Sequence, residues 1–369
     1  MSDISLFLCG DVMLGRGIDQ ILRVPSRPDL YESYARSAQR YVELAEARHG
    51  RIPRHVSPEY VWGDALGVLA REKPALRLVN LETAVTTESR PWPKGINYRM
   101  HPANVDCLTT ARIDCCILAN NHVLDWGREG LAETLDILRR AGMRVAGAGR
   151  DARDAAAAAV LPLADGRRLL TFGFAAAGSG VPLAWAAEAT MPGVNLLPDL
   201  SADRARHLAE IARLQRQPGD LALASIHWGG NWGYAIEAEQ RAFAHALIEG
   251  GFDLVHGHSS HHPLGLEVYR RKLILYGCGD FINDYEGIEG YEEFRPDLVL
   301  MYLPHLDSAT GVLRSLRIVP LQMRRFRLRF PSVSDTAWLF AVLRREGGRL
   351  GTVLAQLNDG SFSVQDATA

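Results

Sequence analysis

A histidine-rich stretch in the second half of the chain has the residue types needed to bind a metal. The chain contains 12 histidines, and four of them fall between residues 256 and 262. Imidazole is largely neutral at pH 7 and is the commonest metal ligand in proteins. His256, His258 and His261 are spaced so that one tight turn can bring all three to a single centre. The alternative is a polar surface loop in which histidine is frequent by chance.

Metal-binding residue types also follow four other apolar runs, which we interpret as buried strands. These runs cover residues 4–9, 76–81, 113–118 and 221–226. Open α/β sheets place their ligand sites at the carboxyl ends of strands, which is where such residues would lie. A mixed carboxylate, amide and imidazole set suits Mn²⁺, Fe²⁺ or Zn²⁺ better than Ca²⁺. The residues concerned are Asp11, Glu82, Asn121, His122 and His227.

The elements between these runs predict an α/β protein. Apolar spacing indicates helices over 57–72, 201–214 and 238–250, and a short strand over 251–255 leads into the histidines. Residues 20–56 are polar and poorly periodic, which indicates an insertion or lid. No linker divides the chain, so we expect one domain over 1–305. Residues 306–369 would add strands and a helix packed on that domain.

Composition is that of a soluble globular protein, with 47% hydrophobic and 23% charged residues. A net charge of −2 gives no electrostatic basis for binding nucleic acid or an anionic membrane. No apolar run approaches the ~18 residues of a membrane span. The N-terminus lacks a basic leader, and the five cysteines lie mostly within apolar runs. We therefore expect a cytoplasmic protein acting on a small molecule or short polymer; the sequence does not indicate its oligomeric state.

Five motifs in combination resemble a known family. They are Gly-Asp-Val-Met-Leu-Gly-Arg (10–16), Val-Asn-Leu-Glu-Thr (79–83), Ala-Asn-Asn-His-Val-Leu-Asp-Trp-Gly (119–127), Ile-His-Trp-Gly (226–229) and the run over 257–281 that ends in Gly-Cys-Gly-Asp-Phe. This set resembles the CapA-type poly-γ-glutamate capsule synthesis family, which is similar to calcineurin-like metallophosphoesterases. The resemblance covers about residues 4–305. It implies a four-layer α/β/β/α sandwich of two mixed sheets, with metals at the strand ends.

The resemblance also implies roles for individual residues. Glu82 would be a bridging carboxylate, and Asn121 would bind the second metal. His122 would stay free of metal and protonate the leaving group or stabilise the transition state. The other implied metal ligands are Asp11, His227, His258 and His261. Whether His256 is also a ligand is left open by the sequence.

Arg16 and Met13 complete the candidate site. The Arg16 guanidinium has the shape to grip a substrate oxyanion, and a structural salt bridge would explain it equally well. Met13 stands where the phosphoesterase pattern has a histidine ligand, and a thioether binds hard divalent ions weakly. We therefore expect one divalent transition metal (Mn, Fe or Zn) to be held firmly and a second more weakly.

These features predict a cytoplasmic metal-dependent hydrolase, acting on a phosphoester through metal-activated water. One alternative is hydrolysis or formation of an amide or γ-glutamyl bond at the same site. The other is a non-enzymatic accessory role in poly-γ-glutamate or capsule synthesis.

Overall fold

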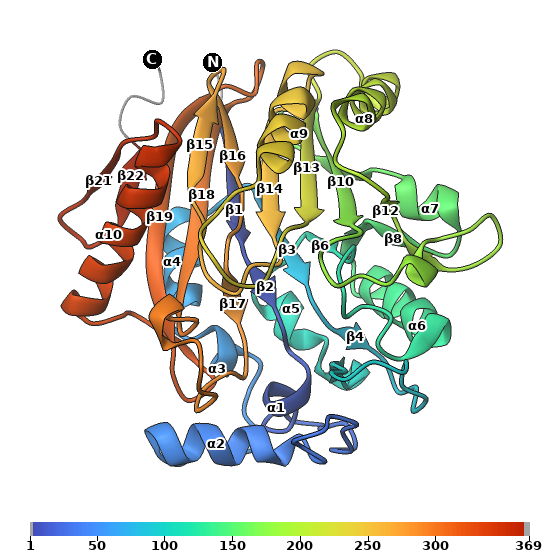
Figure 1. Cartoon of the computed structure of the whole chain (residues 1–369), viewed down its shortest axis with the longest axis vertical. Coiled ribbons are helices and arrows are strands. Elements are labelled where there is room, and N and C mark those ends of the chain that lie inside the picture. The colour runs from blue at the N-terminus through green and yellow to red at the C-terminus, as the bar shows by residue number, and fades with distance from the viewer. Residues whose placement is uncertain (1–2, 365–369) are drawn as a thin grey trace.

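Two large β-sheets form the framework of the computed structural model, which describes residues 3–364 (Figure 1). The larger sheet has the strand order β17 (Asp280–Ile282), β2 (Asp11–Val12), β3 (Leu76–Leu81), β1 (Asp3–Cys9), β18 (Leu298–Asp307), β19 (Leu313–Met323), β22 (Phe362–Val364) and β21 (Leu354–Gln356). Beside these strands lie β20 (Leu328–Arg329), β6 (Cys115–Ile117) and β7 (Arg144–Ala146). The smaller sheet has the order β12 (Leu196–Leu197), β10 (Arg168–Ala176), β13 (Leu221–His227), β14 (Leu254–His258), β16 (Lys272–Leu275) and β15 (Leu266–Tyr269), with β9 (Ala159–Pro162) beside β10. Two small pairs are β4 (Ala84–Val85) with β5 (Arg99–Met100), and β8 (Ala148–Gly149) with β11 (Gly193–Val194).

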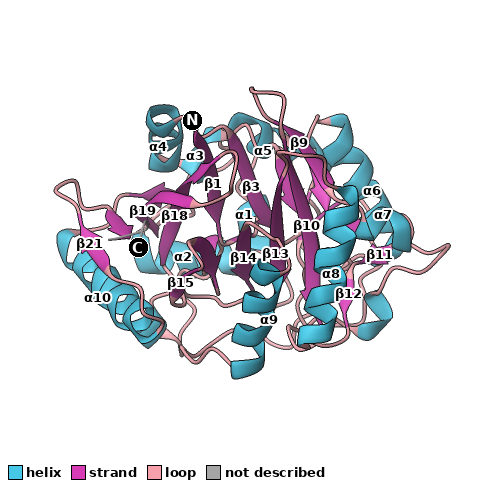
Figure 2. Cartoon of the chain, turned by 90° about the horizontal axis from the view of Figure 1, so that it is seen from above, coloured by secondary structure: helices cyan, strands magenta, loops and turns pink. Residues whose placement is uncertain are grey.

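The two large sheets face each other across an apolar core. Successive side chains of a strand point to opposite faces, and β1 shows this alternation. Leu6 and Leu8 join the core shared with Leu223 of β13, whereas Phe7 and Cys9 belong to the cluster on the other face. Figure 2 shows the two sets of strands with helices outside them.

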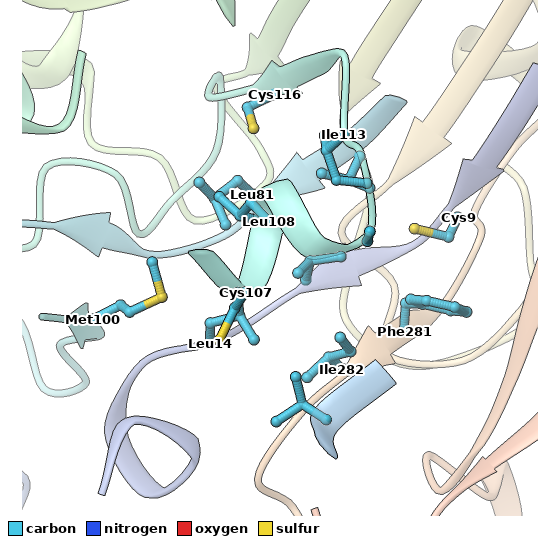
Figure 3. Packing of buried hydrophobic residues seen from close by; sticks show 14 of the residues in the cluster. Cys9, Leu14, Leu81, Met100, Cys107, Leu108, Ile113, Cys116, Phe281 and Ile282 are labelled. Carbon is cyan, nitrogen blue, oxygen red and sulfur yellow. The ribbon is translucent and has the colours of Figure 1, made fainter. Parts of the chain in front are cut away.

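Helices cover the outer faces of both sheets. On the smaller sheet, Phe243 and Leu247 of α9 (Ala238–Glu249) pack with alanines of α8 (Ala202–Gln215). On the larger sheet, the helices are α3 (Glu59–Trp62), α4 (Asp64–Glu72), α5 (Asp106–Thr110) and α6 (Gly127–Arg140). Figure 3 shows Leu108 of α5 beside Leu81 in this cluster. The remaining helices are α1 (Arg16–Asp19), α2 (Gln39–His49), α7 (Ala152–Ala156), α10 (Val333–Arg349) and the 3-10 turns at Pro102–Asn104, Leu183–Trp185 and Glu292–Phe294.

Two predicted segments have a different local structure. The helix expected over 57–72 is divided between α3 and α4 at Gly63, whose φ is 46°. A Cβ at this position would lie 2.0 Å from the Leu328 carbonyl oxygen, so only glycine fits there. The helix is interrupted at this glycine. The segment 20–56 contains α2, which packs against α1.

The strand before the histidines begins later than expected. The sequence predicted a strand over 251–255, but β14 spans Leu254–His258 and therefore contains His256 and His258. Both share a face with Leu254, which belongs to the core between the sheets. The two imidazoles consequently point toward the larger sheet.

The C-terminal part of the chain completes the larger sheet. The boundary expected at residue 305 falls within β18, which pairs with β1, and β19, β22 and β21 extend the same sheet. α10 contacts β15 and β21. Within residues 3–364, no helix is both long and apolar enough to cross a bilayer.

Candidate metal centre

Strands from both sheets bring the candidate ligands together. In the larger sheet, Asp11 is the parallel register partner of Asp280 on one side and of Asn80 on the other. In the smaller sheet, His227 is the parallel partner of His258. The carboxyl ends of these strands point to the same edge in Figure 1, so side chains far apart in the sequence meet there.

One group of possible ligands consists of Asp11, His227 and His258, all buried. The Nδ1 atoms of the two histidines are 3.0 Å apart. Asp11 Oδ1 lies 3.8 Å from His258 Nδ1, and Glu82 Oε2 lies 3.9 Å from His227 Nδ1. Two carboxylates and two imidazoles therefore surround one point.

A second group shares Asp11 and adds His261 and Asp280. His261 Nδ1 is 2.8 Å from Asp280 Oδ1. Because Asp11 belongs to both groups, the structure offers two adjacent cation positions with a common carboxylate. Asp280 was not among the residues predicted from the sequence. Its signal was a Gly-Asp pair after an apolar strand, the same pattern as Gly10-Asp11.

The chemistry of these donors fits divalent cations. Burial raises the pKa of Asp11 to about 7, and the charge of Asp280 adds to the effect. Burial and the charge of Asp11 also hold the pKa of Glu82 well above its ordinary value. Carboxylates crowded together in a buried site need a cation to ionise without a large penalty. Asn121 Oδ1 is buried and has no hydrogen-bond partner, as expected of an amide oxygen kept for a metal.

The two histidines of the first group are in the protonation state that metals require. Burial keeps the pKa of both His227 and His258 well below the ordinary value, so both rings are neutral at pH 7. A neutral imidazole has one nitrogen lone pair available to a metal. At His261, burial opposes protonation, but the adjacent Asp280 carboxylate outweighs it and raises the pKa.

His256 takes a supporting position instead of a place among the ligands. Its Nε2 donates to the Cys9 carbonyl oxygen at 2.8 Å, so Nδ1 must accept from the Ser225 hydroxyl at 3.0 Å. Having donated its only proton, Ser225 Oγ accepts from His258 Nε2 at 3.1 Å. His258 thus keeps its lone pair on Nδ1, the atom that faces the cluster. Through Ser225, His256 is thus placed to orient His258, and it is absent from both groups of possible ligands.

His122 lies beside the ligands with its ring fixed by a carboxylate. Nδ1 is 2.6 Å from Asp125 Oδ2 and, because the carboxylate accepts, carries the proton. Nε2 lies 3.9 Å from Glu82 Oε1. Burial lowers the His122 pKa to about 4, although Asp125 partly opposes this. At neutral pH, Nε2 therefore presents a lone pair to the site.

Arg16 is held by a salt-bridge network. Its Nε donates to Asp284 at 2.8 Å, and a second nitrogen donates to Glu32 at 3.0 Å. The guanidinium carbon lies 3.5 Å from the centre of the Tyr41 ring. Only 3% of the residue is exposed, so the structural salt bridge is the alternative that this geometry supports.

Met13 is fully buried on the same strand end. Its sulfur lies 3.6 Å from the Tyr285 hydroxyl, which is placed to donate to it. No metal-binding group found among the described residues includes a third histidine in place of Met13. The carboxylate of Asp280 supplies a hard oxygen donor in this part of the site.

A cleft of about 610 Å³ reaches the metal centre. His261 and Tyr285 belong both to its lining and to the neighbourhood of the ligands. One wall carries Trp232 stacked on Tyr291, with ring centres 4.0 Å apart. The cleft gives a ligand of small-molecule size access to His261, the one candidate ligand in its lining.

Comparison with known proteins identifies the family. The model of the bacterial capsule synthesis protein PGA_cap family matches residues 5–285. The chain belongs to this family. The resemblance inferred from the motifs is thereby confirmed.

Curated relatives of the PGA_cap chain carry related names. A probable polyglutamine synthesis accessory protein of Mycobacterium tuberculosis is 46% identical over 366 residues, which cover 99% of this chain and 96% of the relative. The capsule biosynthesis protein CapA of Bacillus anthracis is 25% identical over 87% of this chain and 68% of its own length. The PGA biosynthesis protein CapA of Bacillus subtilis is 25% identical over 81% of this chain and 67% of its own length. The family is thus one of capsule and polyglutamate synthesis.

Proposed function

We propose that the chain is a metal-dependent hydrolase that cleaves a phosphoester and serves capsule or polyglutamate synthesis. The observation that carries the proposal is the pair of ligand groups sharing Asp11. Adjacent cation positions joined by a common carboxylate suit the displacement of an oxygen leaving group, because both the attacking and leaving oxygens require charge stabilisation.

In this proposal, residues from both sheets would hold the metals. Asp11, His261 and Asp280 would hold one cation. Asp11 would be shared with the other cation, which His227, His258 and Asn121 would also hold, with Glu82 beside His227. When bound, such ions lower the pKa of water and neutralise charge on phosphoryl oxygens. We expect Mn²⁺, Fe²⁺ or Zn²⁺ from the mixture of imidazole and carboxylate donors.

His122 would move the proton. Its Nε2 faces Glu82 at the ligands, and Asp125 keeps the ring in place through Nδ1. His122 would carry a proton to the leaving-group oxygen as the bond to phosphorus breaks, and the water that attacks phosphorus would replace that proton.

The fold supports this assignment. We propose that the two facing sheets with helices on both outer faces are the four-layer α/β/β/α sandwich of metallophosphoesterases. The support comes from three separate apolar clusters, one between the sheets and one on each outer face.

The charges in the cleft favour a compact substrate over a long polyanion. Arg16 and Arg295, two of the arginines that line it, are already paired with carboxylates of the protein. Carboxylates also line the cleft, including Glu289 and Glu292. A chain of many negative charges would gain little attraction here.

The alternative is cleavage or formation of an amide or γ-glutamyl bond at the same metal centre. The names of the relatives favour it, since they refer to polyglutamine and capsule synthesis. A non-enzymatic accessory role is a third possibility, but it would not require His122 and Asp125 beside the ligands.

A substrate screen tests the proposal. Protein loaded with Mn²⁺, Fe²⁺ or Zn²⁺ is assayed against phosphomonoesters, phosphodiesters and γ-glutamyl amides. Asp280→Asn is the matched control, because it removes one ligand charge while preserving side-chain size. Phosphoester cleavage that is lost in the control supports the proposal. Turnover of γ-glutamyl amides alone selects the alternative, and no turnover by any loaded form refutes the enzymatic assignment.

A further inference from the structure

We infer that Lys94 is a positioning residue that fixes the turn Asn121–Asp125. Through this turn it positions His122 and Asn121, the candidate ligand of the second metal. The inference rests on the proposed function, both for Asn121 as a metal ligand and for its kinetic consequence. Lys94 lies in the irregular segment between β4 and β5, and its side chain is 19% exposed. The family motifs in the sequence did not include it.

The Lys94 ammonium contacts three groups of a single turn. Nζ donates to the Asn121 carbonyl oxygen and to Asp125 Oδ1, the latter at 2.8 Å, and lies 3.3 Å from His122 Nδ1. Asp125 is completely buried. One cation thus balances the buried carboxylate and ties it to the backbone of the candidate metal ligand.

The segment that carries Lys94 is fastened to the same turn. Trp92 N donates to the Asp125 carbonyl oxygen at 2.7 Å, and the Asn97 side chain donates to that oxygen at 3.1 Å. Tyr98 N donates to Asp125 Oδ2 at 2.6 Å, the oxygen that also accepts from His122. Because these bonds hold both ends of the segment, the ammonium has a defined position relative to the turn.

The position of the Lys94 ammonium matters because of Asn121. Its side-chain Oδ1 is buried without a hydrogen-bond partner, so no protein group orients the amide oxygen directly. Its backbone carbonyl accepts from Lys94. The direction of the amide oxygen toward a metal therefore depends on the backbone, and Lys94 is placed to hold that backbone.

The use of lysine at this position is itself informative. Of the 41 basic side chains, only Lys73, Lys94 and Lys272 are lysines. An ammonium is compact and can direct donors from one atom to both the Asn121 carbonyl and the Asp125 carboxylate, whereas the guanidinium of arginine is a wide planar fork. The Trp185 ring, 5.2 Å from Nζ, limits the space beyond the ammonium. Arginine at position 94 would thus supply the positive charge but would not make the same contacts with Asn121 and Asp125.

The test compares Lys94→Met and Lys94→Arg with the control Lys73→Met. Lys73 is exposed at the end of α4 and has no role in the site. We expect both Lys94 variants to lose metal affinity about 10–100-fold, the usual effect of removing an outer-shell partner. Their kcat should fall by about the same factor, with KM little changed. The Lys73 variant should match the wild type.

Each outcome bears on the inference. Wild-type metal affinity and kcat in Lys94→Met would overturn it, and full recovery in Lys94→Arg would show that only charge is needed. If the wild type hydrolyses nothing, the proposed function fails, while metal affinity still tests Lys94. Should the variants not fold, ¹⁵N-lysine spectra of the wild type replace them. The Lys94 ammonium signal should then shift on adding Zn²⁺ while that of Lys73 stays, and an unmoved Lys94 signal would overturn the inference.

Discussion

Ser225→Ala should weaken metal binding although Ser225 touches no metal position. The hydroxyl is the middle member of the relay from the Cys9 carbonyl through His256 to His258. Its removal leaves His258 Nε2 and His256 Nδ1 without partners in a fully buried region. His258 can then exchange tautomers, which places a proton on Nδ1, the atom that faces the ligand cluster.

Two independent ranges of free energy give the expected loss of metal affinity in Ser225→Ala. Leaving a buried donor or acceptor unpaired costs about 1–3 kcal/mol. Removing an outer-shell partner of a ligating histidine typically lowers metal affinity about 10–100-fold, or about 1.4–2.7 kcal/mol. The two ranges agree, so we expect the dissociation constant to rise about 10–100-fold. The loss should appear mainly at the position held by His227 and His258.

The assay is a competition titration of metal-free protein against a chelator of known affinity. Thr171→Val is the matched control, because Thr171 is also fully buried and lies on the neighbouring strand β10. Its hydroxyl has no hydrogen-bond partner, so its removal should leave metal affinity unchanged. Unaltered affinity in Ser225→Ala, or an equal loss in Thr171→Val, would refute the relay.

Three further perturbations test other parts of the structure. Prolonged dialysis should remove one metal equivalent from the wild type, and Met13→His should retain it; two firmly held equivalents in the wild type would contradict the weak position. His122→Ala should keep its metal and lose about 10²–10⁴-fold in turnover, as measured by steady-state kinetics; loss of metal would make His122 a ligand instead. Burial raises the pKa of Asp19 to about 6, so its contribution to stability is present below pH 4 and is lost as the pH rises through 6. The unfolding free energy of the wild type, minus that of Asp19→Asn, should therefore fall by about 2 kcal/mol between pH 4 and 7 in urea titrations, and a flat difference would show that Asp19 does not titrate in this way.

The sequence predicted those features that depend on residues close together in the chain. Asp11 and His227 lie at the ends of runs whose apolar character is visible without a structure, and the structure brings them together. The strand Leu76–Leu81 was predicted with its observed bounds, because a short apolar run between polar segments has few alternatives. The family, too, was evident from motifs that are each continuous in the chain.

Features that depend on distant pairing were not visible in the sequence. Asp280 approaches Asp11 only because β17 pairs with β2, a contact between a strand near the N-terminus and one in the last third of the chain. The supporting role of His256 depends on its facing the Cys9 carbonyl oxygen of another sheet. Helix α2 escaped prediction because only Tyr41, Val42 and Ala45 are buried along it, too few for a clear apolar period.

Because the shared ligand Asp11 comes from one sheet and His227 and His258 from the other, each bound metal would cross-link the two halves of the core. Binding would then be linked to folding, since the unfolded chain cannot assemble ligands so far apart in sequence. A free metal concentration of about 100 times the dissociation constant adds about 2.7 kcal/mol to the stability of a folded protein. Metal supply would thus affect the amount of folded protein as well as any metal-dependent activity. Without the ion, the contact between the two sheets would be less stable even in a chain of unchanged sequence.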